Sequence, residues 1–292
     1  DNVELQRDMV KAYQKIGDIQ GASDTGNLGK TNESLQSYQK ALAMQAKIVG
    51  DNPANFEDKA ILGNLNLDVG LQQRSTGDLN SAEKSLQNAL SIFSNLPNDL
   101  KTQSNLAKTF WNFASLQTAQ NNLDGSLENY GKAVEIYEKL AVDEPTNKRH
   151  LRNVALTSKN IGSVLQLRGE NEKALRHFQK SLGIDLENAK NNPNDVSAQL
   201  DLSFTYGTIA SALRDAKNFQ GAIENHQKAI EIRERIFNAD SKNAFAENAV
   251  ARGFQELGRT YLANQKYLEA EMNFSKAQKI YQKMTDSDIG NY

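Results

Sequence analysis

Four prolines divide this chain into units of nearly constant length. They stand at Pro53, Pro97, Pro145 and Pro193, separated by 44, 48 and 48 residues, and the chain contains no other proline. Proline inside a helix loses a backbone hydrogen bond and clashes with the preceding turn, so each one is expected where a helical unit ends. A period of this length predicts a chain built from repeated supersecondary units.

Three series of small residues follow the same period. The first series lies in the second helix of each expected unit and comprises Ala41, Ala89, Ala133, Ser181, Ala229 and Ala277. The second lies seven residues earlier and comprises Ser34, Ala82, Ser126, Ala174, Ala222 and Ala270. The third lies in the first helix and comprises Gly17, Gly70, Ala114, Gly162, Ala210 and Gly258. Because helices approach closely only where facing side chains are small, these series predict antiparallel helix pairs.

Large side chains accompany the small ones and are expected to fill the grooves beside them. Three positions before the small residue of the second helix stand Tyr38, Leu86, Tyr130, Phe178, His226 and Phe274. The turns between the two helices are expected to begin at Gly77, Asn121, Gly169, Lys217 and Gln265. Glycine and asparagine at such positions commonly end a helix.

Two irregularities interrupt the period. A four-residue deletion falls between Ala89 and Pro97, so the second helix of the second unit is predicted to be about one turn shorter. A five-residue insertion falls in the turn of the first unit, around Ala22 to Gly29. In the last unit, Gln278 replaces the apolar residue that follows the small one elsewhere, which predicts a terminal helix with no further repeat to cover it.

The last unit resembles the tetratricopeptide repeat. The resemblance is carried by Phe254-x2-Leu257-Gly258-x2-Tyr261 and then Ala270-x3-Phe274-x2-Ala277, although the closing proline is absent. The family unit has about 34 residues, which implies about seven extra residues on each helix here. The resemblance covers the whole chain and implies an all-α, right-handed α-solenoid of six helix-turn-helix repeats. The expected repeats are residues 1–52, 53–96, 97–144, 145–192, 193–241 and 242–284, and a frayed tail is expected at 285–292.

The first unit carries a narrower resemblance. Its segments Leu5–Asp8, Ala12–Gly21, Asn27–Thr31 and Ser37–Leu42 look like the long repeats that follow the catalytic domain in some bacterial serine/threonine kinases. This resemblance implies a non-catalytic regulatory or sensory region as the alternative to a partner-binding scaffold. The kinase motifs themselves are absent from the sequence, so this segment is not expected to phosphorylate proteins. A helical pattern starts directly after Asp1, and we expect a piece of a longer protein.

Composition argues against several function classes. Lys and Arg total 34 against 36 for Asp and Glu, a net charge of −2, so a nucleic-acid partner is not expected. The sequence has no apolar run of about 18 residues, so we expect a soluble segment without membrane insertion. The absence of cysteine excludes disulfides and thiolate sites. It leaves open whether the compartment is cytoplasmic or, beside a membrane-anchored kinase, extracytoplasmic.

Two apparent chemical motifs do not meet the requirements of a site. The stretch Gly26–Thr31 ends like a phosphate-binding loop, but Asp24 occupies the position of the first glycine and a helix precedes the segment. His150 and His177 lie on different expected helices of the fourth unit and His226 lies in the fifth, and none has a second ligand at metal-binding spacing on its own helix. We therefore expect no enzyme, no catalytic residue, no metal and no cofactor.

Partner contacts are expected on the concave face that first helices line in the tetratricopeptide family. The preferred centre is Trp111, flanked by Lys108, Lys159 and Arg214, because binding hot spots favour Trp and Arg and cations suit an acidic or extended peptide. Packing of Trp111 within the solenoid is the alternative. The predicted contacts are Asn64, Arg74, Lys108, Trp111, Asn112, Ser115, Lys159, Asn160, Ser163, Arg214, Arg252, Gln255 and Arg259. The partner is expected to be a protein or peptide, and the oligomeric state stays open.

Overall fold

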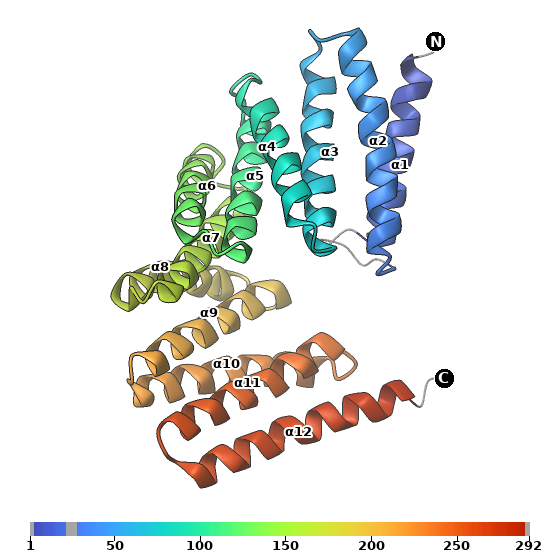
Figure 1. The fold of residues 1–292 in the computed structure, drawn as a ribbon. Coiled ribbons are helices and arrows are strands. Elements are labelled where there is room, and N and C mark those ends of the chain that lie inside the picture. The colour runs from blue at the N-terminus through green and yellow to red at the C-terminus, as the bar shows by residue number, and fades with distance from the viewer. Residues whose placement is uncertain (1–2, 22–27, 290–292) are drawn as a thin grey trace. The chain divides into compact units, whose positions relative to one another are not determined.

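The computed structural model describes residues 3–21 and 28–289, and in these ranges the chain folds into twelve α-helices without a strand (Figure 1). The predicted all-α helical repeat fold is thereby confirmed. Consecutive helices form pairs. The pairs are α1 (Val3–Gly21) with α2 (Thr31–Asp51), α3 (Phe56–Ser75) with α4 (Leu79–Ser94), α5 (Leu100–Ala119) with α6 (Leu123–Asp143), α7 (Lys148–Leu167) with α8 (Asn171–Asn191), α9 (Val196–Asp215) with α10 (Phe219–Ala239), and α11 (Ala244–Ala263) with α12 (Tyr267–Ile289).

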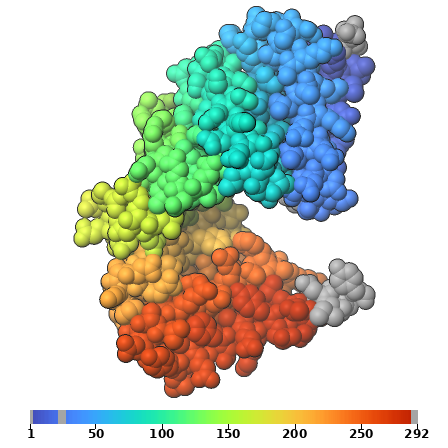
Figure 2. Space-filling view, viewed as in Figure 1, coloured from blue at the N-terminus to red at the C-terminus, as the bar shows by residue number. Residues whose placement is uncertain are grey.

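The chain divides into two compact units, Asp1–His150 and Leu151–Tyr292. Inside each unit the helices pack in chain order, each pair against the next, and the side chains of neighbouring helices fill the space between them (Figure 2). In the first unit, for example, one apolar cluster joins Leu67 of α3, Leu86 of α4 and Phe113 of α5. Each repeat therefore buries its apolar surface against its neighbours, as expected for a repeat array.

The helices of a pair approach one another at the small residue of the first helix, as predicted. A Cβ atom added to Gly162 would lie 2.4 Å from Cε1 of the Phe178 ring, which is closer than any real Cβ contact. The same opposition joins three further pairs, Gly17 with Tyr38, Gly70 with Leu86, and Gly258 with Phe274. The small residues of the second helices are all buried. These contacts confirm the register of small and large residues.

The turns between paired helices contain a left-handed residue where the sequence predicts the end of the first helix. The φ angle is positive at Gly77, Asn121, Gly169, Lys217 and Gln265. Asp78, Asn122 and Asn218 then cap the second helix, each accepting a hydrogen bond from the backbone N–H three residues further on. The prolines also stand where predicted, directly after second helices, as Pro53 does after α2.

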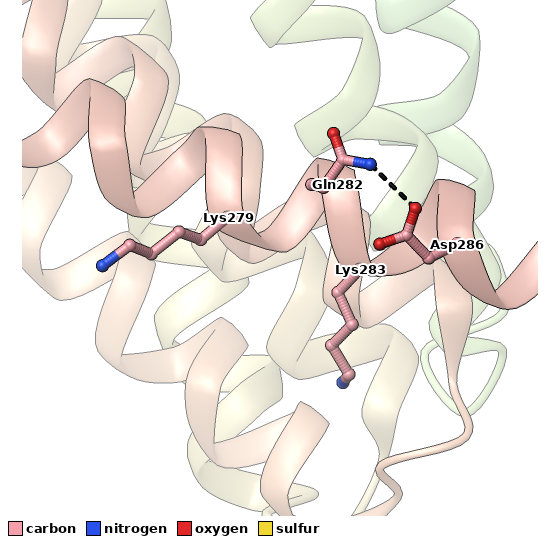
Figure 3. Close-up of a pocket in the computed structure, with 4 residues that line it drawn as sticks. All are labelled: Lys279, Gln282, Lys283 and Asp286. Carbon is pink, nitrogen blue, oxygen red and sulfur yellow. Dashed lines mark hydrogen bonds between the residues drawn. The ribbon is translucent and has the colours of Figure 1, made fainter.

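Two second helices differ in length from the others: α4 is shorter and α12 is longer. Helix α4 has 16 residues, against 21 in α2, α6, α8 and α10, which confirms the shorter second helix of the second repeat. Helix α12 continues to Ile289, which lies within the segment 285–292 expected as a frayed tail. Side-chain contacts one turn apart support this end of the helix, including Gln282 Nε2 donating to Asp286 Oδ1 at 2.8 Å (Figure 3).

The insertion in the first repeat lies largely outside the described residues. Positions 22–27 are not described, so neither the predicted turn there nor Gly26 and Asn27 of the phosphate-loop candidate can be placed. Gly29, at the end of this turn, has a φ of +68°, and Thr31 begins α2. The described part of the segment therefore leads into a helix.

Replacing Gly162 by alanine tests the close approach. Alanine in place of glycine usually stabilises a helix by about 0.5–1 kcal/mol. Gly162→Ala is expected instead to lower the free energy of unfolding by about 1–3 kcal/mol, because the new methyl group would overlap the Phe178 ring. Gly183 of α8 has no atom within 4 Å of an added Cβ, so Gly183→Ala is the matched control and should stabilise. Urea unfolding measures both; equal stability of the two variants would contradict the packing.

Candidate functional site

Three predicted contact residues of the first unit, Arg74, Trp111 and Ser115, lie on α3 and α5, and Tyr130 of α6 packs against Trp111. The ring of Trp111 on α5 is half-buried and meets Tyr130 of α6 edge-on, with centroids 6.1 Å apart and planes at 72°. Arg74 Nη1 on α3 donates to Ser115 Oγ on α5 at 2.9 Å. Trp111 thus packs within the repeat on one side and keeps part of its ring exposed on the other.

Lys159, predicted as a flanking cation of the binding centre, is buried. Its side chain lies on α7 with the residue only 8% exposed, and Nζ is 3.3 Å from Oδ2 of Asp185 on α8. The same carboxylate accepts hydrogen bonds from Ser181 Oγ at 3.2 Å and Thr205 Oγ1 at 2.6 Å. A buried carboxylate with this partner set holds the ammonium group inside the fold, so Lys159 cannot serve as a surface contact.

The other predicted contacts differ from one another in burial and in their neighbours. Asn112 is buried, and its Nδ2 donates to the backbone oxygen of Lys108 at 2.8 Å within α5. Gln255 lies beside Phe274 and Tyr281 of α12. Asn64 and Asn160 are half-buried and Ser163 is exposed. The predicted contacts therefore differ in depth, which the helical register did not predict.

Arg214, Arg252 and Arg259 do come together, in a groove of the second unit. The groove lies among α9, α10 and α11 and has a volume of about 460 Å³. Residues of the first helices α9 and α11 form its sides, and two deeply buried side chains of α10, His226 and Arg233, form its floor. Four arginines and one carboxylate line it, so the groove is strongly positive.

The single carboxylate, Glu256, bridges the two sides of the groove. Arg214 Nη1 on α9 lies 3.0 Å from Glu256 Oε2, and Arg259 Nη1 on α11 lies 2.6 Å from Glu256 Oε1. Arg252 is exposed at the rim, and the structure shows no ion pair for it among the described residues. Glu256 therefore neutralises part of the positive charge, and Arg252 and Arg233 remain without an anion.

Arg233 is a buried cation without a carboxylate partner. The residue is 7% exposed; Nε donates to Ser203 Oγ at 3.2 Å, and Nη1 donates to the Ala249 oxygen at 3.1 Å. The guanidinium also lies 5.1 Å from the ring centroid of Phe204. Burial, and then the charge of Arg252, lower the pKa of Arg233 to about 10, so it still carries its charge at neutral pH. Buried charges are costly unless an anion compensates them.

His226 occupies the packing position predicted for it, and one of its ring nitrogens is buried without a hydrogen-bond partner. The residue is 2% exposed, and its Nε2 has no hydrogen-bond partner among the described residues. Burial is the main cause that lowers the His226 pKa to about 4; Glu256 opposes the shift, while Arg214 and Arg233 add to it. The ring is therefore neutral at pH 7 and can donate or accept a hydrogen bond through Nε2.

Two exposed aromatic rings stand at one end of the groove. Phe204 of α9 and Phe245 of α11 meet edge-on, with centroids 6.3 Å apart and planes at 73°. An exposed aromatic pair beside a positive groove offers both an apolar contact and anion-binding donors. The arrangement can therefore hold an acidic chain that carries an apolar side chain.

Sequence reasoning missed Arg233 and both phenylalanines. Arg233 lies on a second helix, whose side chains the register assigns to packing. The equivalent position holds Gln45, Phe93, Tyr137, Asp185 and Tyr281 in the other repeats, so a charged residue there was only a weak signal. Phe204 and Phe245 gave no comparable signal in the sequence.

No cluster of three metal-ligating side chains occurs within residues 3–21 and 28–289. None of the helices in this part of the chain has the length and apolar character that crossing a bilayer requires.

Comparison with known proteins supports the repeat fold. A family model described as tetratricopeptide repeat matches residues 205–241, which include part of α9 and all of α10. No curated protein sequence matches the chain. The crystal structure of BtubC (BKLC) from P. vanneervenii has a TM-score of 0.67 at 16% identity, covering 87% of this chain and 92% of that one.

Two further crystal structures are similar over almost the whole chain. The apo form of RapI has a TM-score of 0.65 at 15% identity, covering 96% of this chain and 77% of that one. Aspartyl phosphate phosphatase F from Bacillus subtilis has a TM-score of 0.57 at 11% identity, covering 95% and 68%. At these identities the likeness concerns the helical fold alone.

Lys159→Ala separates a structural role from a binding role. Removing the cation leaves the Asp185 carboxylate buried and uncompensated, so the free energy of unfolding is expected to fall by about 3 kcal/mol. Arg252→Ala, at an exposed position, should change it by less than about 0.5 kcal/mol. Thermal or urea unfolding measures the stability of both variants. If Lys159→Ala leaves the free energy of unfolding unchanged, the buried ion pair with Asp185 is contradicted and Lys159 is again a candidate surface contact.

His226 makes stability depend on pH. The folded protein holds the His226 pKa at about 4, below the ordinary 6.5, so the unfolded chain binds this proton more readily. The resulting stability is complete above pH 6.5 and is lost as pH falls toward 4, by up to about 3 kcal/mol. His226→Phe, the residue type of the fourth and sixth repeats at this position, should remove this loss. Unfolding free energies of both proteins at pH 7, 5.5 and 4 test it, and parallel pH profiles would refute it.

Proposed function

We propose that this chain is a scaffold that binds a protein or peptide partner, and that the groove among α9, α10 and α11 is its principal contact site. The observation that carries the proposal is the floor of the groove. There the buried, charged Arg233 has no carboxylate and His226 Nε2 has no hydrogen-bond partner among the described residues. The hydrogen bonds of Arg233 go to neutral oxygens of Ser203 and Ala249, so its buried charge is not compensated, and an anionic ligand in the groove would compensate it.

The chemistry of the groove favours an acidic peptide. Arginine binds carboxylates through paired, charge-assisted hydrogen bonds, and Arg252 stands at the rim, where a partner meets it first. Phe204 and Phe245 offer an apolar contact beside these donors. An extended segment with one or two Asp or Glu residues next to an apolar residue fits both features.

The cluster around Trp111 is proposed as a second contact area in the first unit. Trp111, Arg74, Lys108 and Ser115 lie on first helices there, and the exposed part of the Trp111 ring can contribute to binding as aromatic hot spots do. Asn112 and Lys159 are left out because both are buried. The resemblance of the first repeat to kinase-associated repeats favours a signalling context, in which this chain would supply partner recognition and not catalysis.

Selection from a random peptide library tests the proposed ligand. Peptides that bind the 292-residue chain are expected to be rich in Asp or Glu next to Leu, Ile or Phe. Arg252→Glu should weaken the best of them at least 10-fold, about 1.4 kcal/mol, as measured by fluorescence anisotropy. Arg176→Glu is the matched control, because it makes the same charge change at an exposed position of α8 outside the groove.

The control separates local contact from long-range charge. Binding through the groove predicts that Arg176→Glu changes affinity less than twofold. Equal weakening by both substitutions would indicate only a general charge effect, and selected peptides without acidic residues would contradict the proposed ligand.

A further inference from the structure

Helix α9 carries a glycine where every other first helix carries a long side chain. Gly207 stands in the middle of α9, three positions before the small residue Ala210, and it lines the groove of the second unit. The equivalent residues of the other repeats are Gln14, Leu67, Trp111, Lys159 and Gln255. Glycine inside a helix is less favourable than alanine, so the missing side chain weakens α9 locally. We therefore asked what the space above Gly207 provides to the groove.

The space above Gly207 is open and leads to Arg233. Apart from the backbone of α9 itself, a Cβ atom added to Gly207 would have one neighbour within 4 Å, Nη2 of Arg233 at 3.5 Å. At Gly253 of α11, by contrast, an added Cβ would overlap Ile230 at 2.7 Å, so that glycine is required for packing. Gly207 is not required in this way. A longer side chain at this position would begin directly beside the guanidinium group and occupy this part of the groove.

The guanidinium group of Arg233 is held in place and still has unused donors. Nε donates to Ser203 Oγ, Nη1 to the backbone oxygen of Ala249, and Nη2 to the backbone oxygen of Ser203 at 3.4 Å. Because a guanidinium group has five N–H donors, these three bonds leave two without an acceptor among the described residues. The ring of Phe204 also lies against the group. An anion that enters above Gly207 therefore meets an oriented cation with free donors.

Two of the four arginines in the groove have no carboxylate. Arg214 and Arg259 share Glu256, whereas Arg233 and Arg252 form no ion pair within residues 3–21 and 28–289. The charge of Arg252 adds to the effect of burial in lowering the pKa of Arg233, so the two cations are close enough to interact. One carboxylate would compensate one of these charges. A phosphate monoester carries about −1.5 to −2 charges at pH 7 and three acceptor oxygens, so it matches both.

We infer that the space above Gly207 is a phosphate pocket, into which the partner inserts a phosphorylated serine or threonine. This inference rests on the proposed function of the groove as a peptide contact site. The phosphate oxygens accept hydrogen bonds from the unused donors of Arg233 and from Arg252 at the rim. The groove continues to Phe204 and Phe245, where an apolar residue next to the phosphorylated one finds its contact. A peptide is therefore a better ligand than a free phosphate compound, which lacks this second contact.

One peptide in three forms tests the preference for phosphate. Selection from a library with a fixed central phosphoserine and random flanking positions supplies the probe. The best binder is then made with phosphoserine, glutamate or serine at the centre, and its affinity for the unmodified 292-residue chain is measured by fluorescence anisotropy. The phosphoserine form should bind at least tenfold more tightly than the glutamate form, and the serine form should bind most weakly. Equal affinities of the phosphoserine and glutamate forms would overturn the phosphate pocket.

Gly207→Gln tests the location of the pocket. The substitution introduces the residue type of the first and sixth repeats and should weaken the phosphoserine peptide at least tenfold. Gly183→Gln makes the same change at an exposed position of α8 where an added Cβ has no neighbour, and it should change the affinity less than twofold. Neither variant should lower the midpoint of urea unfolding without peptide, because glutamine favours a helix more than glycine does. Unchanged affinity in Gly207→Gln would contradict the pocket.

Competition with inorganic phosphate separates a phosphopeptide from a free phosphate compound. Inorganic phosphate should displace the labelled peptide only at concentrations at least a hundredfold above the dissociation constant of the peptide, because it makes no contact outside the pocket. Displacement by inorganic phosphate at the dissociation constant of the peptide itself would overturn the assignment of a peptide as the ligand.

The outcomes also separate this inference from the proposed function. If the glutamate and phosphoserine forms bind equally and Arg252→Glu weakens both, the groove binds acidic peptides and only the phosphate pocket is wrong. If Arg252→Glu weakens neither form, the groove is not the contact site, and the proposed function fails together with the inference.

Discussion

The close approach of two helices at a small residue is the contact on which the rest of the structure depends. At Gly162 the ring of Phe178 occupies the space in which a side chain would begin, and Gly17, Gly70 and Gly258 stand against equivalent large side chains. This contact determines which side of each first helix faces its own partner. A second side then faces the neighbouring repeat, and the remaining side faces solvent. The surface available for binding is therefore a consequence of the packing register.

The groove of the second unit arises where the fifth repeat departs from that register. Other repeats place Tyr, Phe or Leu against the first helix, whereas the fifth has His226. Four positions after its small Ala229 it has Arg233, the one cation at a position that also holds the buried Gln45 and Asp185 in other repeats. Both are buried, and both are costly there without a ligand. Packing positions that carry polar groups at the expense of stability are expected at functional sites.

Local pattern was enough to predict much of the fold. The period, the small and large positions of each helix pair, the left-handed turns and the shortened α4 all follow from residue spacings that recur from one unit to the next. The depth of individual side chains does not. Lys159 was expected at the surface, but its carboxylate partner is Asp185, 26 positions away on the next helix. Arg233 was missed because its access to solvent depends on how α9 and α11 are separated, which no single helix encodes.

Nuclear magnetic resonance of glycine-labelled protein tests the packing register most directly. An aromatic ring placed against Gly162 and Gly258 should shift their Hα resonances upfield by ring current, and nuclear Overhauser contacts should join these protons to the rings of Phe178 and Phe274. Gly131 and Gly183, which have no neighbouring atom at an added Cβ, should show neither effect. Unshifted Hα resonances at Gly162 and Gly258, without contacts to an aromatic ring, would contradict the account.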